Sequence, residues 1–311
     1  MSNRRNLIDM GERMNTGAYQ QLSQEQVDHF LARGHVVIHD CFSAEFAEQW
    51  KALAFDRLGY DRDDSSTWVK SRIHMPAMRR EEVKQIAPKA WRAMCDLLGG
   101  EDRIKQPTSW GDSFILNLRD GIDRPWEAPS ARSPGWHKDG DWFRHFLDSP
   151  EQGLLVIVVW SDIGPRGGAT IASPDSIAPV ARFLASHPEG VLPGGFNFRS
   201  MIEECSEFVE LTGRTGDVIL IHPFTLHASS QNHSGIPRFI TNPAVSLREP
   251  MRFDRDDPAE YSLVEQVVLR ALGAPKLEFR PTHERERVVP ERERIQKKML
   301  EEQQARLAAM A

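Results

Sequence analysis

Two stretches of the sequence hold side chains that could bind a metal ion together. The first, residues 135–141, contains the pair His137-x-Asp139. On an extended chain, residues two apart point to the same side, so the sequence predicts that this imidazole and this carboxylate converge on one point. A His-x-Asp pair is common by chance, and without further support a solvated surface loop is the more frequent explanation.

The second stretch, residues 215–238, supplies that support. His227 is the predicted third ligand, and Arg238 follows it at 238 − 227 = 11 positions, after a polar loop. If the chain returns antiparallel there, the guanidinium comes back beside the metal, where its planar fork suits a substrate carboxylate. Ser229 shares the face of His227 and offers a hydroxyl to the same carboxylate. Two histidines and one carboxylate on one side of a metal are typical of non-haem iron(II) oxygenases.

Two nearby residues compete for these roles. A ligand at His222 would place Arg238 at 238 − 222 = 16 positions and lose the serine two residues on, so we interpret His222 as a histidine behind the site or in the core. Asp141 points to the same side as Asp139 but lies about 6.8 Å further along an extended chain, too far to share a metal with His137. Lys138, between the two ligands, is predicted to face away.

The elements that would position these residues are short strands. Runs rich in β-branched residues and bounded by Gly, Pro and Asp predict strands at 35–39, 114–118, 154–160, 169–172, 207–211, 217–222 and 238–246. Capping and apolar spacing predict helices at 23–33, 43–58, 177–187 and 257–272. Many short strands with helices outside them predict a mainly β fold with flanking helices, an antiparallel sandwich or jelly roll.

The ends of the chain differ from its middle. Residues 1–21 are polar and aperiodic and are predicted to form a flexible arm, while 22–275 form the catalytic domain. The tail, 276–311, is charged and is predicted to be helical from Pro290 onward. A solvated helix is the favoured interpretation of this tail. A homo-oligomer contact through Ile295, Met299 and Leu307 is the alternative.

The composition limits the classes of partner. The chain has 311 residues and a formal net charge of -6, with 39 basic and 45 acidic residues, so it lacks the basic excess expected of a nucleic-acid-binding protein. No apolar run reaches the roughly 20 residues that a membrane span needs, and the start does not read as a secretory signal. Three scattered cysteines favour free thiols in a reducing cytoplasm. No nucleic-acid or membrane partner is therefore expected.

Residues 22–250 resemble the phytanoyl-CoA dioxygenase family. The resemblance lies in the Trp-His-x-Asp run, in residues 159–162, in 167–170 leading to 174–176, and in the Gly-Asp-Val…His-x-Ser…Arg stretch. It implies a double-stranded β-helix core of cupin-like jelly-roll type, iron(II), dioxygen and a 2-oxoglutarate co-substrate. Matching the motifs implies that the iron ligands are His137, Asp139 and His227. It implies that Arg238 and Ser229 bind the distal carboxylate of oxoglutarate. It also implies that Trp160 and Asn117 line the oxoglutarate pocket. A charged insert at 119–133 departs from the family pattern.

The resemblance also implies a reaction. Oxidative decarboxylation of 2-oxoglutarate to succinate and CO2 would accompany hydroxylation of an unactivated C–H bond in a small or medium-sized organic metabolite. Two other functions compete with this hypothesis: a metal-dependent hydrolase that uses the same site with zinc, and a non-catalytic jelly-roll binding module. Arg238 and Ser229 argue against the hydrolase, and the complete ligand set argues against the binding module. The substrate pocket is expected to form from the N-terminal helices, the insert and residues 142–146.

Overall fold

The computed structural model describes residues 19–310. The predicted flexible arm, 1–21, lies almost wholly outside this range. Where the described chain begins, the backbone amides of Gln20, Gln21 and Leu22 donate to the Asp96 carboxylate at 2.9, 2.8 and 3.0 Å. No helix of the described part combines the length and the apolar character that crossing a bilayer would require.

The α-helices are α2 (Gln24–Arg33), α3 (Ala44–Lys51), α4 (Ala54–Leu58), α5 (Val83–Ile86), α6 (Pro88–Leu98), α7 (Ile177–Ala185), α8 (Phe198–Glu203), α9 (Leu263–Leu272) and α10 (Glu291–Met310). The strands are β1 (His35–Ile38), β2 (Arg72–His74), β3 (Arg80–Glu82), β4 (Ser109–Gly111), β5 (Ile115–Asn117), β6 (Leu154–Val159), β7 (Thr170–Ser173), β8 (Val209–Leu211), β9 (Val218–Ile221), β10 (Leu226–Ser229), β11 (Arg238–Thr241) and β12 (Ala244–Val245). Short 3₁₀ turns lie between them, including η5 (Pro258–Glu260).

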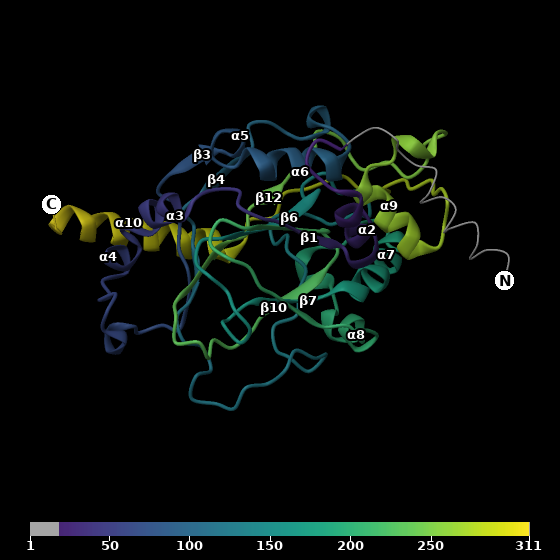
Figure 1. Ribbon diagram of the computed structural model, residues 1–311. Coiled ribbons are helices and arrows are strands. Elements are labelled where there is room, and N and C mark those ends of the chain that lie inside the picture. Colours follow the sequence, from purple (N-terminus) through teal and green to yellow (C-terminus); the bar gives the residue numbers. More distant parts are fainter. Residues whose placement is uncertain (1–18, 311) are drawn as a thin grey trace.

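Two antiparallel sheets form the centre of the molecule (Figure 1). The larger has seven strands in the order β1-β9-β6-β11-β5-β2, with β12 also paired to β6, and the smaller has the order β10-β7-β8. Side chains alternate along β6, so Leu155, Ile157 and Val159 pack with Ala172 and Leu211 of the smaller sheet. The two sheets therefore stack face to face. This confirms the predicted mainly β jelly-roll core, as an open sandwich rather than a closed barrel.

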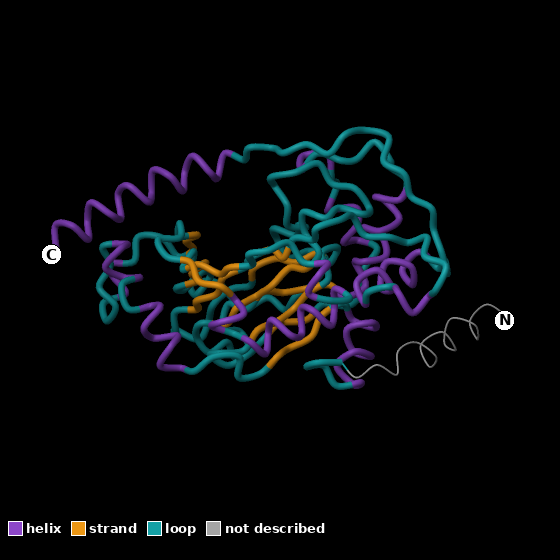
Figure 2. The backbone as a smooth tube through the Cα atoms, turned by 90° about the horizontal axis from the view of Figure 1, so that it is seen from above, coloured by secondary structure: helices purple, strands orange, loops and turns teal. Residues whose placement is uncertain are grey.

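The other face of the large sheet packs on helices. Leu154, Val156 and Val158 of β6 belong to the main core together with residues of α2, α6, α7 and α9. Seen from above, helices lie on more than one side of the strands, and the helix that ends at the C-terminus is separated from the others (Figure 2). The predicted flanking helices are thus present and cover the face of the large sheet that points away from the smaller sheet.

Three predicted elements are each divided in the structure. The helix predicted at 43–58 is α3 followed by α4, because Leu53 is 53% exposed and the apolar stripe does not continue through it. The helix predicted at 257–272 starts later, where Ser262 forms a capping box with Glu265, and η5 precedes it. The strand predicted at 238–246 breaks at Asn242 and Pro243 into β11 and β12.

The charged tail is helical from Glu291, as predicted, and packs on its own chain. Helix α10 lies along α4, at the left of the molecule in Figure 1. The buried Gln303 accepts a hydrogen bond from Arg57 Nε at 2.9 Å, and Met299 packs against the main core. The alternative of a homo-oligomer contact through this helix finds no support in the structure, and its Ile295 is 51% exposed.

Candidate metal centre

His137, Asp139 and His227 meet at one point. Their ligand atoms all lie within 4.8 Å of one another. The Nε2 atom of His137 is 3.5 Å from Asp139 Oδ1, and the Nε2 atom of His227 is 3.6 Å from the same oxygen. The two imidazole rings are 4.4 Å apart, centroid to centroid. The three residues predicted as ligands are therefore brought together.

Backbone pairing fixes this arrangement. The amide and carbonyl of His137 exchange hydrogen bonds with those of His227, at 3.0 and 2.9 Å, in an isolated antiparallel bridge. His227 itself lies on β10, opposite Ala172 of β7, so its side chain points between the two sheets. Directly opposed residues on paired strands bring their side chains close together, which explains why two distant histidines face one point.

Each imidazole is oriented by a carbonyl two residues before it. His137 Nδ1 lies 2.7 Å from Gly135 O, and His227 Nδ1 lies 3.1 Å from Thr225 O. A carbonyl only accepts, so each Nδ1 carries the proton and each Nε2 keeps its lone pair for a metal. Both Nε2 atoms face Asp139, and the tautomers are therefore those that a metal site needs.

The carboxylate of Asp139 has its own support. Its Oδ2 accepts a hydrogen bond from Asn242 Nδ2 at 3.0 Å, which leaves Oδ1 toward the imidazoles. Burial alone would raise the pKa of this carboxyl, but His227 and His137 outweigh burial and hold the pKa well below its usual range. For His137, burial opposes and Asp139 favours the charged form, and its pKa is raised. Asp139 is thus ionised, as a metal ligand must be.

The donor set fits a divalent transition metal. Two imidazole nitrogens and one carboxylate oxygen on one side leave further coordination positions open toward the cavity, which is the arrangement of non-haem iron(II) oxygenases. The cavity beside the cluster has a volume of about 750 Å³. Among the residues lining it are His137, Asp139 and Ser229. Ser229 follows His227 by two positions on β10, and its hydroxyl makes no hydrogen bond within residues 19–310.

Arg238 is a buried cation behind the wall of this cavity. It lies on β11 opposite Asn117 and is 1% exposed. Its Nε donates to Gly168 O at 2.8 Å and its Nη1 to Ile115 O at 3.0 Å, and no carboxylate of the described chain pairs with it. Burial, and then the charge of Arg72, lowers the pKa of Arg238 to about 9. A buried guanidinium without a counter-ion is costly, so this position is suited to an anionic ligand.

The structure places Asn117 and Trp160 behind the cavity rather than in its lining. Asn117 is fully buried, its Nδ2 donating to Ser230 O at 2.9 Å and its Oδ1 accepting from the Asp120 amide at 3.0 Å. Trp160 stacks on Trp50 in the main core and donates from Nε1 to Thr241 Oγ1 at 3.0 Å. Thr241 does line the cavity. The oxoglutarate-lining role that the family resemblance implied for both residues stays a prediction.

The competing residues have other partners. His222 is fully buried, with Nδ1 accepting from the Phe224 amide at 3.1 Å and Nε2 3.3 Å from Val264 O, so it is a core histidine. Asp141 lies outside the cluster and pairs with Arg292. The Nζ of Lys138 is hydrogen-bonded to Asp139 O and His145 Nδ1, and burial lowers its pKa to about 7. Its ammonium group is therefore occupied by these contacts.

The cavity wall contains residues that the sequence did not single out. Asn242 follows β11, and its only sequence signal is an Asn-Pro pair at the end of a predicted strand. Arg292 and Gln296 come from α10, and His74 and Arg80 from β2 and β3. The insert at 119–133 does not reach the lining and instead packs on the loop before β11, where the Glu127 amide donates to Gln231. Of the segment 142–146, Trp142 lines the cavity.

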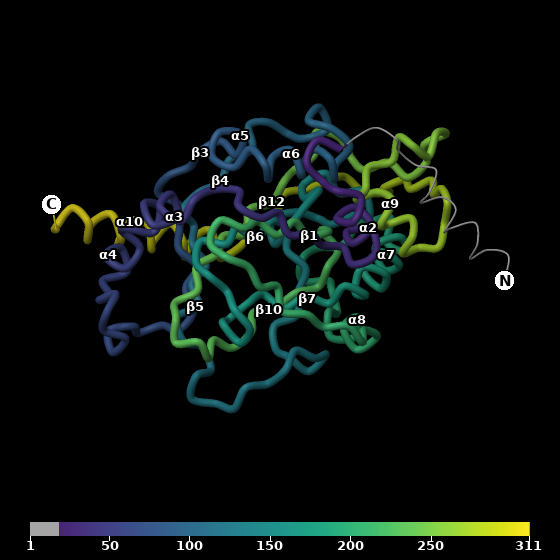
Figure 3. The backbone as a smooth tube through the Cα atoms, viewed as in Figure 1, coloured from purple at the N-terminus to yellow at the C-terminus, as the bar shows by residue number. Residues whose placement is uncertain are grey.

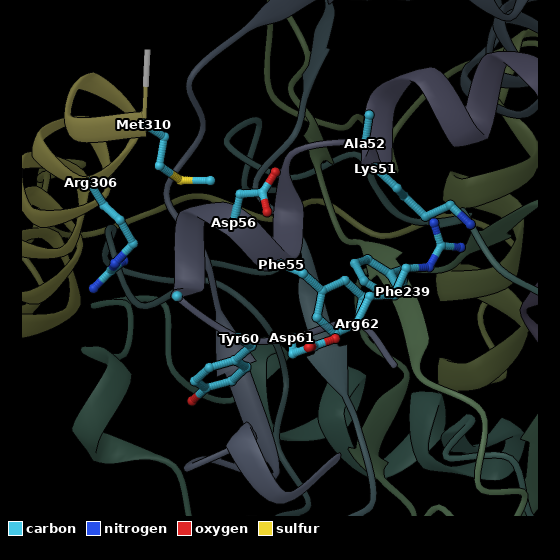
Figure 4. A pocket seen from close by; sticks show the side chains of 11 residues that line it. Lys51, Ala52, Phe55, Asp56, Tyr60, Asp61, Arg62, Phe239, Arg306 and Met310 are labelled. Atoms are coloured by element: carbon cyan, nitrogen blue, oxygen red, sulfur yellow. The ribbon is translucent and has the colours of Figure 1, made fainter. Parts of the chain in front are cut away.

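A second cavity lies apart from the metal centre. It has a volume of about 510 Å³ and is lined by residues of α3, α4, α10 and Phe239, none of them shared with the first cavity (Figure 4). Its cations are already engaged, since Lys51 pairs with Glu48 at 2.6 Å and Arg306 donates to Arg57 O. It contains no ligand cluster in the described part of the chain. The tube drawing of Figure 3 shows α4 and α10 well away from β10, which carries His227.

An antiparallel β-sandwich that holds two imidazoles and a carboxylate beside a cavity, with a buried unpaired arginine behind it, defines the class of non-haem iron(II) and 2-oxoglutarate oxygenases. The family model described as phytanoyl-CoA dioxygenase (PhyH) matches residues 20–240, most of the sequence, and the chain belongs to this family. The protein is a non-haem iron(II) and 2-oxoglutarate-dependent dioxygenase, as the sequence predicted.

Solved structures of similar shape include three proteins of low sequence identity to this chain. The 2-oxoglutarate-dependent carbocyclase SnoK of nogalamycin biosynthesis has 16% identity and a TM-score of 0.43, with 75% of this chain and 87% of that chain covered. EctD from S. alaskensis, with 2-oxoglutarate and 5-hydroxyectoine, has 20% identity and a TM-score of 0.39, with 75% and 78% covered. HygX from Streptomyces hygroscopicus, with nickel and 2-oxoglutarate, has 14% identity and a TM-score of 0.41, with 72% and 87% covered. No match was found among the curated proteins. The family assignment rests on the family match and on the residues of the site.

Proposed function

We propose that this protein hydroxylates an unactivated C–H bond of a small or medium-sized organic metabolite. One molecule of dioxygen and one of 2-oxoglutarate are consumed, and one oxygen atom enters the product while succinate and CO2 are released. The observation that supports this most strongly is Arg238, a buried guanidinium without a carboxylate partner in residues 19–310, next to a cavity that holds a metal-ligand cluster. A dicarboxylate co-substrate supplies the missing anion.

In this proposal each residue has a defined role. His137, Asp139 and His227 hold iron(II), which supplies the activation of dioxygen when bound. Arg238 and Ser229 bind the distal carboxylate of 2-oxoglutarate, the guanidinium through its charge and the serine through its free hydroxyl.

The surrounding residues prepare this set. The carbonyls of Gly135 and Thr225 hold the protons at Nδ1 of the two histidines. Asn242 keeps the Asp139 carboxylate turned toward the imidazoles. Because these contacts are made by backbone and by a side chain at the end of β11, the ligands are held before the metal arrives, which favours tight binding.

Two other functions remain as competitors. A zinc hydrolase on the same three ligands would need no bound dicarboxylate and leaves the buried charge of Arg238 unexplained. A non-catalytic binding module would not require both histidines to be held as the tautomer that leaves Nε2 free. The three cysteines are free, which supports the predicted reducing, cytoplasmic setting.

The test is anaerobic addition of iron(II) and then 2-oxoglutarate to the full chain. Chelation of iron by the keto acid gives a visible charge-transfer band, which zinc hydrolases and plain binding modules do not produce. Arg238→Gln is expected to weaken 2-oxoglutarate binding by about tenfold or more, because a charge-assisted pair is lost. Absence of the band in the wild-type protein would rule out the proposal. The mass of the product then distinguishes hydroxylation, which adds one oxygen, from desaturation or ring closure.

A further inference from the structure

One part of the cavity wall holds polar side chains without partners. His74, Arg80, Ser113, Trp142 and Gln296 all line the cavity beside the metal ligands. Within residues 19–310, none of their side-chain polar groups takes part in a hydrogen bond or an ion pair. Most of the neighbouring polar groups are engaged, as in the pair of Asn242 with Asp139. We call these five residues the donor wall.

The fold directs Arg80 across this wall. Strand β3 pairs with β4, with Arg80 directly opposite Gly111, and both residues line the cavity. A Cβ atom on Gly111 would lie 3.2 Å from Arg80 Cγ and 3.0 Å from Arg79 O. Because Gly111 has no side chain, the aliphatic part of the Arg80 side chain has room beside it.

The charges of the cavity do not cancel at this place. Arg292 also lines the cavity, but its charge is matched by Asp141 through two hydrogen bonds of 3.0 and 2.7 Å. Asp139 faces the two metal-binding histidines. Two lining cations form no ion pair within residues 19–310, Lys138 and Arg80. Lys138 is hydrogen-bonded to Asp139 O and His145 Nδ1, whereas the Arg80 side chain, on the exposed strand β3, makes no polar contact in that range.

His74 links the donor wall to the metal centre. It sits at the end of β2, opposite Ile115, and lines the cavity together with Asp139, Asp141 and Arg292. A ligand group held by Arg80 and His74 would therefore contact the wall of the cavity that also contains His137 and Asp139. Arg238, which the proposed function assigns to 2-oxoglutarate, donates to Gly168 O and Ile115 O. Ile115 is the strand partner of His74, so a test of the donor wall must keep the 2-oxoglutarate site filled.

We propose that the donor wall binds an anionic oxygen group of the organic substrate, a carboxylate or a phosphate, with Arg80 as its charge partner. This inference rests on the proposed function and defines the substrate class for it. Arginine presents several N–H groups in a plane and suits the two oxygens of such a group, while His74, Trp142 and Gln296 each offer one further donor. The anion holds one end of the substrate at the wall and leaves the remainder of the molecule in the cavity beside the metal.

The test uses the full chain with manganese(II) in place of iron and with saturating 2-oxoglutarate, so that the metal and Arg238 are both occupied. Inorganic phosphate and ¹³C-labelled acetate serve as probes, and their nuclear relaxation is measured by NMR. A nucleus bound beside the metal relaxes faster, and the effect saturates as the site fills. We expect a saturable effect for at least one probe. Phosphate alone would indicate a phosphate-bearing substrate, and acetate alone a carboxylic acid.

The variants assign the effect to Arg80. Arg80→Gln is expected to weaken probe binding by about tenfold, because one charge-assisted contact is lost, while Arg80→Lys retains part of the affinity. Arg199→Gln, on α8 and paired with Glu203, is the matched control and is expected to match the wild type. Equal relaxation in Arg80→Gln and the wild type, or no saturable effect in the wild type, would overturn the anion site.

The result is independent of the test of the proposed function. If the iron(II) and 2-oxoglutarate band forms normally in the wild type and in Arg80→Gln but the relaxation does not depend on Arg80, the oxygenase assignment stands and the anion site falls. If the band is missing in the wild type, the proposed function falls whatever the probes do. An intact band in Arg80→Gln also shows that this variant is folded.

Discussion

Arg292 and Asp141 tie the C-terminal helix to the loop that carries a metal ligand. Arg292 Nε lies 3.0 Å from Asp141 Oδ2, and its Nη2 lies 2.7 Å from Oδ1. The chain before α10 also pairs with this loop, since the Val288 amide donates to Trp142 O and the Arg144 amide donates to Glu286 O. The family match ends at residue 240, so the tail adds a wall to the cavity from outside the matched region.

Removal of this pair is expected to loosen the wall without unfolding the protein. The two side chains are 39% and 44% exposed, so Arg292→Gln should change the free energy of unfolding by about 1 kcal/mol or less. Amide hydrogen exchange of residues 139–146 and 286–296 should become faster, because the helix is no longer held to the loop. Arg287→Gln, which breaks the exposed Arg287–Glu293 pair in the same tail, is the control and should leave the loop unchanged. Unaltered exchange in Arg292→Gln would show that this pair does not hold the wall.

Metal binding should distinguish His227 from His222. His227→Gln removes a ligand, and Asp139→Ala removes the carboxylate, so both variants should lose iron(II) binding and 2-oxoglutarate-dependent succinate formation. His222→Gln should keep both, because this histidine contacts Phe224 and Val264 in the core. Metal titration and succinate release measure the difference. Full activity in Asp139→Ala would refute the ligand set.

Asn242 is expected to tune the metal centre without binding the metal. Asn242→Ala removes the hydrogen bond to Asp139 Oδ2 and frees the carboxylate to turn. Loss of such an orienting partner typically lowers metal affinity about 10- to 100-fold. Iron(II) titration under anaerobic conditions measures this change. Asn197→Ala, at the N-cap of α8, is the matched control and should change only stability. Equal affinities in Asn242→Ala and the wild type would remove Asn242 from the site.

Local sequence patterns predicted the parts of the site that depend on short spacings. His137 and Asp139 are two residues apart, and the run 154–160 is β-branched, so both could be read without knowing the fold. The partnership of His227 with His137 also followed, because the spacing to Arg238 matched a returning strand. The direct backbone pairing of the two histidines was not predicted, since register between distant segments has no local signal.

The residues that the sequence analysis missed depend on long-range contacts. Asn242 is 103 positions from Asp139, and Arg292 is 151 positions from Asp141. From the sequence, Arg292 cannot be distinguished from the solvated arginines of the charged tail, because the position of the tail in the fold is not known. Trp160 packs in the aromatic core, and the lining role that a family motif implied for it stays a prediction. The sequence did not show which face of a strand is occupied by a residue near the end of that strand.

The buried His222 should make the protein sensitive to acid. Burial lowers the pKa of His222 to about 3, although the contact with Val264 opposes the shift, while the unfolded chain has the ordinary value of about 6.5. Between these two pH values the unfolded state binds a proton that the folded state does not, so the free energy of unfolding falls as the pH drops from 6.5 toward 3. This single group contributes up to about 1.4 kcal/mol per pH unit in that window and nothing above it.

His222→Gln removes the titrating group while keeping an amide that can donate to Val264 O. The variant is expected to be less stable than the wild type near pH 7, because the acceptor for the Phe224 amide is lost, and to lose less stability on acidification. Urea unfolding at intervals between pH 7 and pH 4 measures both curves, with the metal absent so that ligand protonation does not add to the difference. His29→Gln, at an exposed position on α2, is the matched control and should follow the wild-type curve. If the unfolding free energies of His222→Gln and the wild type change with pH in parallel, His222 takes up its proton as readily in the folded state as in the unfolded chain. The core would then tolerate the charged imidazole.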